Sequence, residues 1–442
     1  MIEPRTLKGF RDYPPELAIP REALIDTAKR VFRSYGYGPI DTPALEYAEI
    51  LLGKLDTSAE IRRQIYRFKD HGDRDVALRF DLTVPFARFA AQHIGKLGTP
   101  FKRYHVGSVW RGENTQAGRY REFVQCDFDI IGTTANAADI EIALVIHDLM
   151  VALGFEKFQL RINNRLVLNG VLQSMGIAER SGAVLTALDK LTKQGRDAVL
   201  AEMTGAAAGL TNAQAERLLA LAEATGTNRE IIDRVAAELG SEGKLAEGIT
   251  RLRELVTAAE TAGIPDDRLR IDLGICRGLD YYTGTIYETF LNDLPRIGSV
   301  CSGGRYDDLA GLYTKQKLPG VGASLGLDRL LAAMEELKLL PQTRTPAQLL
   351  IVQFAADQIG TYQRIARELR AAGIGVEVFP DAKKLGNQLQ YAETRGYAIA
   401  LIAGPDELAR NVVKLKVLAK REETVVELAQ LMPTVKRLLG ES

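Results

Sequence analysis

The chain has 442 residues, too many for one ordinary hydrophobic core, so we expect two or three domains. Hydrophobic residues make up 46% and charged residues 26%, a balance that argues against an intrinsically disordered chain. Lys and Arg together number 57, as do Asp and Glu, and the zero net charge argues against a general nucleic-acid-coating protein, which would be basic.

The first part of the chain, about residues 1–169, mixes helix-like and strand-like sequence. The periodicity of its apolar residues predicts helices over 22–34 and 139–153, and extended segments over 39–45, 78–83 and 124–130. In the last two segments apolar and polar residues alternate, so each of these strands would present one polar face.

From about residue 170 to residue 262 the composition changes. Ala, Leu, Glu and Arg dominate, strand-forming residues are sparse, and short Gly, Thr and Asn stretches separate the helical runs. This texture indicates an inserted helical module. Strand-like sequence returns over 268–273 and 281–290, and a helix predicted over 327–337 closes this part of the chain.

A linker is predicted at 343–346. Beyond it, the pattern predicts strands over 349–354, 375–379, 398–403 and 412–418, and helices over 362–372, 385–394 and 425–439. We expect the last helix to be broken at Pro433. This alternation predicts a small α/β domain with a largely parallel sheet.

The numbers and spacing of the cysteines and histidines indicate neither disulfide bonds nor a metal site. Cys126, Cys276 and Cys301 are far apart and odd in number, which argues against a disulfide framework or a paired-cysteine zinc site and fits a reducing cytoplasm. The histidines lack metal-binding spacing, the N-terminus has no apolar core of signal-peptide length, and no apolar run reaches the length of a membrane span. We therefore expect a soluble intracellular protein without a structural metal.

The most informative segment is 101–132, where a charged loop separates two strand-like stretches. The second stretch places Gln125, Asp127 and Asp129 on one face. Charged residues surround the glycine-containing loop, namely Arg111, Glu113, Arg119 and Arg121. Guanidinium groups here could bind a polyphosphate while the carboxylates receive a cationic ligand. A water-facing antiparallel strand with hydrated loop charges would give the same pattern.

Two further segments combine glycines with polar groups. In 271–288, Arg277, Asp280, Tyr281 and Tyr282 lie between apolar positions, and nearby glycines allow close approach of a ligand. Core packing of the tyrosines would give the same pattern. The segment 320–329 leads into a helix, but its glycine spacing differs from that of dinucleotide-binding turns and no strand–helix–strand unit surrounds it.

Together these segments resemble those of a known family. FKRYHVGSVWRGENTQAGRYREFVQCDFD resembles motif 2 of class II aminoacyl-tRNA synthetases in its histidyl form, and RGLDYYTGTIYE resembles the signature segments of histidyl-tRNA synthetases. GVGASLGLDRLL is similar to motif 3. The helix from Glu22 and the following GYGPIDTPALE are similar to motif 1, with Pro43 as its proline. Residues from about Pro346 onward resemble the anticodon-binding domain of the family.

The resemblance implies an α+β fold: a class II synthetase antiparallel sheet flanked by helices, with a helical insertion and a C-terminal α/β domain. It divides the chain into a catalytic domain in two parts (1–169 and 263–340), a helical insertion (170–262) and an anticodon-binding domain (346–442). The implied activity is the ATP-dependent ligation of histidine, through histidyl-adenylate, to the 3′ end of tRNA(His).

The resemblance also assigns roles to residues at matching positions. Arg277 and Arg111 are the implied catalytic residues, and Gln116 and Arg119 would approach the acceptor end of the tRNA. The implied histidine-binding residues are Asp81, Leu82, Thr83, Arg111, Gln125, Asp129, Arg277, Tyr281 and Tyr282. The implied ATP-binding residues are Arg111, Glu113, Arg121, Phe123 and Arg329. Adenine would lie between Phe123 and Arg329, and the imidazole between Asp129 and Tyr282.

The sequence departs from many bacterial members of the family at two of these positions. It has Asp81 and Asp129 where those members carry the longer glutamate, as in the subgroup shared with eukaryotic enzymes. The negative charges are kept, whereas the distances from carboxylate to ligand change with the shorter side chain.

The resemblance further implies a homodimer that pairs through the motif 1 region, and Mg²⁺ that is bound together with ATP. Two alternatives stay open: a non-catalytic paralogue acting as a histidine-sensing regulatory subunit, such as that of ATP phosphoribosyltransferase, and a histidine-sensing module of a larger regulator. Such paralogues typically lose active-site residues and the anticodon-binding domain. This chain keeps Arg111, Glu113, Arg277 and Arg329, and it continues beyond the linker for the length of a small domain.

Overall fold

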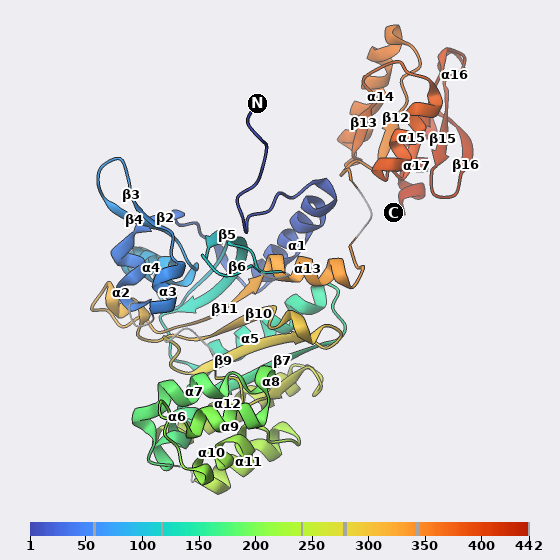
Figure 1. Cartoon of the computed structure of the whole chain (residues 1–442). Helices are drawn as coiled ribbons and strands as arrows, with labels where there is room; N and C mark the ends of the chain where they lie inside the picture. The colour runs from blue at the N-terminus through green and yellow to red at the C-terminus, as the bar shows by residue number, and fades with distance from the viewer. Residues whose placement is uncertain (56–58, 116–117, 240–241, 277–280, 341–343, 441–442) are drawn as a thin grey trace. The chain divides into compact units, whose positions relative to one another are not determined.

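The structure is a computed structural model that describes residues 1–55, 59–115, 118–239, 242–276, 281–340 and 344–440. The chain forms two compact units (Figure 1). The larger unit comprises Met1–Arg11 and Leu24–Lys338, and the smaller one comprises Asp12–Ala23 and Leu339–Ser442.

An eight-stranded sheet forms the centre of the larger unit. In spatial order its strands are β1 (Gly38–Pro39), β5 (Phe101–Trp110), β6 (Glu122–Ile131), β11 (Gly320–Gly326), β10 (Cys301–Arg305), β9 (Thr285–Leu291), β7 (Phe158–Asn164) and β8 (Leu269–Ile271). From β5 to β7 each strand is antiparallel to its neighbours, and the outer strands β1 and β8 pair in parallel. The predicted α+β fold with an antiparallel sheet is confirmed.

Three helices accompany this sheet: α1 (Pro15–Ser34), whose part from Leu24 onward belongs to the larger unit, α5 (Asn136–Ala152) and α13 (Leu327–Glu336). The core between sheet and helices includes Phe32 of α1, whose ring centroid lies 4.9 Å from that of Phe128 on β6. The helix predicted from residue 22 begins at Pro15 instead, because proline is well suited to the first helical position. Pro20 is accommodated inside the helix.

A smaller sheet and its helices form a lobe at the left of Figure 1. Its elements are β2 (Leu45–Tyr47), β4 (Asp75–Leu78), β3 (Arg67–Lys69), α2 (Ala48–Leu55), α3 (Ala59–Gln64) and α4 (Thr83–Leu97). The strand predicted over 78–83 is wrong, because β4 ends at Leu78 and α4 begins at Thr83. Asp81 accepts a hydrogen bond from the Val84 N–H (3.0 Å), as a carboxylate at a helix N-terminus does.

The helical module between β7 and β8 contains seven helices among the described residues: α6 (Arg165–Ser174), α7 (Ser181–Leu188), α8 (Leu191–Gln194), α9 (Arg196–Thr204), α10 (Asn212–Ala222), α11 (Asn228–Leu239) and α12 (Gly243–Thr261). In Figure 1 they gather beside β7 and β9. Helices α6 and α12 pack closely at Gly248 of α12. A Cβ atom there would lie 2.9 Å from the backbone nitrogen of Val167, so no larger residue fits without displacement. No helix in the described ranges is both long and apolar enough to span a membrane.

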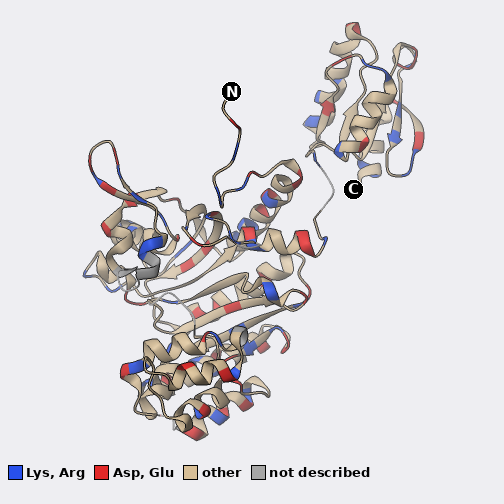
Figure 2. Cartoon of the chain, in the orientation of Figure 1, with Lys and Arg blue, Asp and Glu red and all other residues tan. Residues whose placement is uncertain are grey.

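Within residues 344–440 the smaller unit contains a five-stranded sheet and four α-helices. The strand order is β13 (Val376–Val378), β12 (Leu349–Ile351), β14 (Ile399–Ile402), β15 (Val412–Val417) and β16 (Glu422–Glu427). The helices are α14 (Ile359–Ala371), α15 (Leu385–Arg395), α16 (Pro405–Ala409) and α17 (Leu431–Leu439). Figure 2 shows that Lys/Arg and Asp/Glu positions are interspersed in both units rather than gathered in one of them.

Three predictions for this unit are wrong. The sheet is mixed rather than largely parallel, because β12 pairs in parallel with β13 and β14 whereas β15 is antiparallel to both of its neighbours. The helix predicted over 425–439 begins at Leu431, because Val425 and Val426 belong to β16, where β-branched residues are favoured. Pro433 does not break α17, since it lies in the first turn, where its missing N–H is not needed.

Candidate active site

One face of the large sheet carries a row of polar residues. Paired positions place them side by side on successive strands in the order His105, Asp127, Ser324, Ser302, Glu288 and Arg161. Alternate residues of a strand point to the same face, so Gln125 and Asp129 share this face with Asp127. The strand predicted over 124–130 is thus confirmed, but its polar side chains are buried rather than facing water.

Two adjoining cavities lie over this face, of about 140 Å³ and about 420 Å³. Both are lined by Arg111, Glu113, Arg119, Gln125, Ser302, Ser324 and Arg329, so they form one continuous cleft. Phe123 and Tyr120 lie at the smaller cavity, and Asp81, Thr83, Tyr281 and Tyr282 lie at the larger one. Segments far apart in the sequence therefore meet here.

Charged and aromatic groups line the smaller cavity together. The Arg111 guanidinium lies 5.2 Å from the centre of the Phe123 ring, and its Nε donates a hydrogen bond to the Phe80 carbonyl (3.0 Å). Its Nη1 is 3.8 Å from Glu113 Oε1, while Arg119 Nη1 is 3.6 Å from Glu113 Oε2. These three charged side chains are partly exposed, so each can give up its ion pair and contact a bound ligand instead.

Arg329 and Arg121 differ in how they lie relative to the cleft. Arg329 is in the first turn of α13, lines both cavities and donates to the Ser299 carbonyl. Arg121 lines neither cavity. Its Nε donates to the Glu113 carbonyl (3.2 Å) and its Nη1 to the Lys8 carbonyl (3.3 Å), so it supports the backbone of the charged loop.

The larger cavity ends in an aromatic and acidic pocket. The Tyr281 and Tyr282 rings meet edge to face with centroids 5.1 Å apart. Burial raises the pKa of both phenols, so they remain neutral donors. Burial also raises the pKa of Asp81, against the opposing effects of the Val84 N–H and the Arg111 charge. Leu82 is fully buried and offers its carbonyl to Arg103, so its side chain is not part of the cleft lining.

Asp129 lies beneath this pocket rather than in the lining of either cavity. The Tyr306 hydroxyl donates to its Oδ1 (2.6 Å), and Arg103 Nη2 is 2.7 Å from its Oδ2. Arg103 Nη2 also lies 4.0 Å from Asp127 Oδ2. Burial raises the pKa of Asp129, and it raises that of Asp127 to about 7, while the nearby Arg103 charge lowers both. Sequence reasoning missed Arg103, although it occupies the position opposite Asp129 on β5.

Arg277 and Gln116, two of the residues that the sequence assigned to the site, lie outside the described residues. The part of the chain that the structure describes contains no group of three or more His, Cys, Asp or Glu side chains placed to hold a metal ion. Cys126, Cys276 and Cys301 are buried, and none of the three forms a disulfide in the part of the chain that the structure describes.

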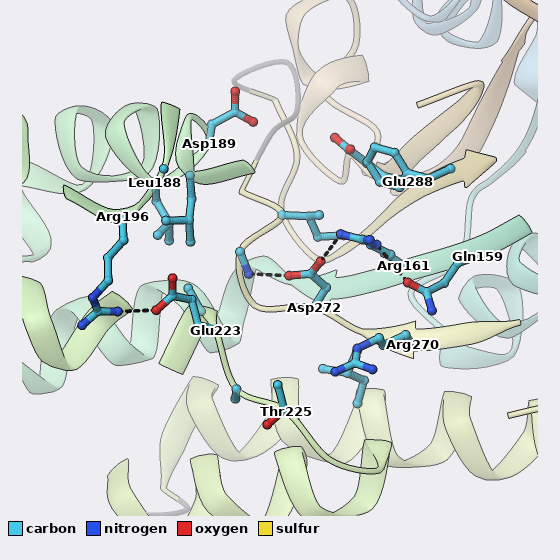
Figure 3. A pocket seen from close by; sticks show the side chains of 18 residues that line it. Gln159, Arg161, Leu188, Asp189, Arg196, Glu223, Thr225, Arg270, Asp272 and Glu288 are labelled. Atoms are coloured by element: carbon cyan, nitrogen blue, oxygen red, sulfur yellow. Dashed lines mark hydrogen bonds and ion pairs between the residues drawn. The ribbon is translucent and has the colours of Figure 1, made fainter. Parts of the chain in front are cut away.

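A third cavity, of about 520 Å³, lies between β7–β9 and the helical module (Figure 3). Figure 3 shows the Arg161–Asp272 pair on the sheet side (2.9 Å) and the Arg196–Glu223 pair on the module side. Glu288 lines both this cavity and the larger part of the cleft. No local pattern in the sequence indicates this cavity, because its walls include residues as far apart in the chain as Gln159 and Phe290.

The cleft has the composition expected for joining a polyphosphate to a cationic amino acid. Arginine forks can stabilise negative charge that develops on phosphate oxygens, and buried carboxylates can receive an ammonium group. The described lining contains Tyr and Ser hydroxyls but no His or Cys side chain. Positioning and electrostatic stabilisation are therefore the means of catalysis that this lining offers.

Comparisons with known proteins agree with this chemistry. Residues 9–330 match the family model of histidyl-tRNA synthetase, and residues 348–438 match that of an anticodon-binding domain. A histidine–tRNA ligase of Rhodopirellula baltica is 56% identical over 422 residues, covering 96% of this chain and 95% of the relative. One of Wolinella succinogenes is 46% identical over 418 residues, covering 94% of each chain.

A solved structure supports the same assignment. The crystal structure of histidyl-tRNA synthetase from Nostoc sp. PCC 7120 superposes with a TM-score of 0.90 at 34% identity, covering 99% of this chain and 100% of the other. An ATP phosphoribosyltransferase regulatory subunit/histidyl-tRNA synthetase from Bacillus halodurans superposes with a TM-score of 0.74, and at 21% identity this likeness shows the fold alone. By these matches over nearly its whole length, the chain belongs to the histidyl-tRNA synthetase family.

Proposed function

We propose that this chain activates histidine with ATP to form histidyl-adenylate and then transfers the histidyl group to the 3′ end of tRNA(His). The observation that carries the proposal is the single cleft in which Arg111, Glu113 and Arg329 adjoin the pocket formed by Asp81 and the two tyrosines. Family membership supports the same activity.

ATP binds in the smaller cavity under this proposal. Its adenine stacks between Phe123 and Arg329, with the amino group on Glu113, and its α-phosphate contacts Arg111. The aromatic ring and the partly exposed charges at this cavity support these roles. Arg121 assists from outside the cavity by holding the loop, since both of its bonds are to backbone carbonyls.

Histidine binds in the larger cavity, with its ammonium group near Asp81, Thr83 and Gln125. Tyr282 and Asp129 bracket the imidazole, and Tyr281 lines the pocket. Asp129 lies beneath the residues that line the larger cavity. The imidazole can therefore contact Asp129 only if the ring enters beyond the present floor of that cavity. A competitor without ring N–H groups would lose its bonds to the phenol and the carboxylate, and the phenol would be left without its ligand partner, which costs about 1–3 kcal/mol.

The chemistry then proceeds in two displacements. A carboxylate oxygen of histidine attacks the α-phosphorus, the bond to the bridging oxygen breaks, and pyrophosphate leaves. A ribose hydroxyl of the terminal tRNA nucleotide then attacks the carbonyl carbon of the mixed anhydride, and AMP leaves with the bonding electrons. Arg111 and Arg277 stabilise the charge on the α-phosphate oxygens in both steps. Mg²⁺ enters as part of the ATP substrate, bound chiefly by phosphate oxygens.

Partners follow from the same family membership. Gln116 and Arg119 approach the acceptor end of the tRNA, and residues 346–442 bind the anticodon, which the family-model match at 348–438 supports. We further propose a homodimer that pairs through the motif 1 region, and a cytoplasmic location. The regulatory-subunit alternative is not favoured, because the 56% identical relative is a histidine–tRNA ligase and covers the anticodon-binding region as well.

The test is histidine-dependent ATP–pyrophosphate exchange followed by charging of unfractionated tRNA. Exchange that is absent with all twenty amino acids would overturn the proposal. Asp129→Ala and Tyr282→Phe should each raise the KM for histidine by tenfold or more, since each removes a partner of the imidazole. Arg364→Ala, on an exposed surface of α14, is the matched control. A change of only a few-fold in both pocket variants would refute the imidazole assignment.

A further inference from the structure

The end of β7 contacts the segment that carries the histidine pocket on both sides. Asn163, Asn164 and Arg165 join β7 to α6, the first helix of the helical module. The pocket residues Tyr281 and Tyr282 precede β9 in the chain, and residues 272–276 follow β8; both stretches are called the pocket segment below. Asn163 and Asn164 are fully buried, so their polar groups require partners.

The outgoing side of the segment is held by side chains. Asn163 Nδ2 donates to the carbonyls of Leu273 (3.3 Å) and Ile275 (3.0 Å). Arg165 Nη1 donates to the carbonyl of Cys276 (3.2 Å). The Arg161–Asp272 pair of Figure 3 binds the same stretch to β7 two residues before Asn163. Four of the residues from 272 to 276 are thereby bound to one strand end.

The returning side is held by the same residues. The backbone N–H of Arg165 donates to the carbonyl of Gly284 (2.8 Å), two residues after Tyr282. Asn164 pairs with Thr285 in the sheet register, and its Nδ2 lies 3.5 Å from Thr285 Oγ1. Arg165 therefore bonds to both sides of the segment, at Cys276 and at Gly284.

These residues also begin the helical module. Asn164 caps α6, because its Oδ1 accepts from the Leu166 N–H (2.9 Å). Helix α6 is in turn packed closely on α12 at Gly248. A displacement of α6 relative to the sheet would therefore move Arg165 and change the bonds on both sides of the pocket segment.

We propose that Asn163 and Arg165 are positioning residues that hold Tyr281 and Tyr282 in place for histidine, and that they couple the helical module to the histidine pocket. Neither residue lines the cleft, so neither touches the substrates. This inference rests on the proposed function of the two tyrosines. Loss of a bond would widen the range of positions available to the pocket segment and weaken histidine binding, while the ATP side of the cleft keeps its own supports.

The experiment compares KM values for histidine and ATP in pyrophosphate exchange by the full chain. Arg165→Ala should raise the KM for histidine by about tenfold and leave the KM for ATP within about twofold, since one hydrogen bond to a carbonyl is lost. Arg165→Lys should restore much of the difference, because an ammonium group can still donate to Cys276. Asn163→Ala should act in the same direction as Arg165→Ala.

Asn228→Ala is the matched control. Asn228 also bonds the module to the sheet, through the Leu269 carbonyl (2.9 Å) and the Ile271 N–H (2.8 Å), but it does not contact the pocket segment. It should lower the melting temperature without changing the ratio of the two KM values. The proposal is refuted if Arg165→Ala leaves that ratio unchanged, or if Asn228→Ala changes it equally. Absence of histidine-dependent exchange in the unmodified chain would instead refute the proposed function itself.

Discussion

Replacement of Arg103 by methionine tests the electrostatics beneath the proposed histidine pocket. The Arg103 side chain has no exposed surface, and its guanidinium lies 4.4 Å from the centre of the Phe86 ring. It is 2.7 Å from Asp129 and 4.0 Å from Asp127. The substitution keeps an apolar stem of similar length but removes the positive charge between two buried carboxylates.

The expected loss of stability is large. Removing one partner of a buried ion pair costs about 3–5 kcal/mol, because the remaining charge is left without compensation. Each kcal/mol lowers the melting temperature of a domain of this size by about 2–4 °C, so we expect a decrease of about 10 °C. Asp127→Asn added to Arg103→Met should recover part of this loss, since it removes one of the two carboxylates.

The loss should depend on pH in a defined direction. Burial raises the pKa of Asp127 to about 7 even with Arg103 present, and the Arg103 charge acts to lower it. Without Arg103 the pKa of both carboxyls rises further, so the folded state binds more protons than the unfolded state. Stability then falls as the pH rises through the folded-state pKa. The deficit of the variant should therefore be smaller at about pH 5 than at about pH 8.

Thermal denaturation of both proteins at these two pH values measures the effect. Arg67→Met is the control, because Arg67 pairs with Asp75 on an exposed hairpin and its loss should change stability by less than about 1 kcal/mol. A melting temperature of Arg103→Met within about 2 °C of the unmodified protein at both pH values would refute the electrostatic account.

Three further predictions concern the cleft and the core. Gly322→Ala should abolish histidine-dependent exchange, because the added Cβ would overlap the Asp129 carboxylate and lie 2.6 Å from the Phe128 carbonyl oxygen, whereas Gly311→Ala, with open space at the Cβ position, should be tolerated. Glu113→Gln should raise the KM for ATP by about tenfold with little effect on that for histidine, and an equal rise in both would contradict the adenine role. The three buried thiols should react with Ellman's reagent only after unfolding, since burial raises the pKa of Cys276 and Cys301, and fast labelling of the folded protein would contradict this.

Local sequence patterns predicted much of the secondary structure because they depend on neighbours in the chain. The alternation over 124–130 predicted a strand with Gln125, Asp127 and Asp129 on one face, and β6 has that arrangement. The same logic failed at 78–83, where Arg79 is held by the distant carbonyls of Thr42 and Ser108 and Asp81 bonds to the start of α4, rather than both lying on one face of a strand. It also failed at Val425, where pairing with β15 decides the conformation.

The family resemblance predicted which residues lie near the substrates but not what supports them. It predicted that Arg111, Glu113 and Tyr282 lie at the substrate site, and the described lining of the cleft contains all three. It did not reveal Arg103 or Arg165, because arginine at a single position in a strand or a helix start resembles any surface charge. Their roles depend on partners such as Asp129 and Gly284, which are distant in the sequence.

The sequence by itself determined the family, most of the elements and the chemical types of the groups proposed to contact the substrates, since these follow from local periodicity and from motifs along the chain. Only the tertiary structure decided which of those groups share a cavity, that Asp129 lies beneath the pocket on Arg103, and that one strand end bonds to both sides of the histidine segment. The physical reason is that burial and pairing arise from segments brought together by sheet formation, and these contacts leave no local pattern in the chain.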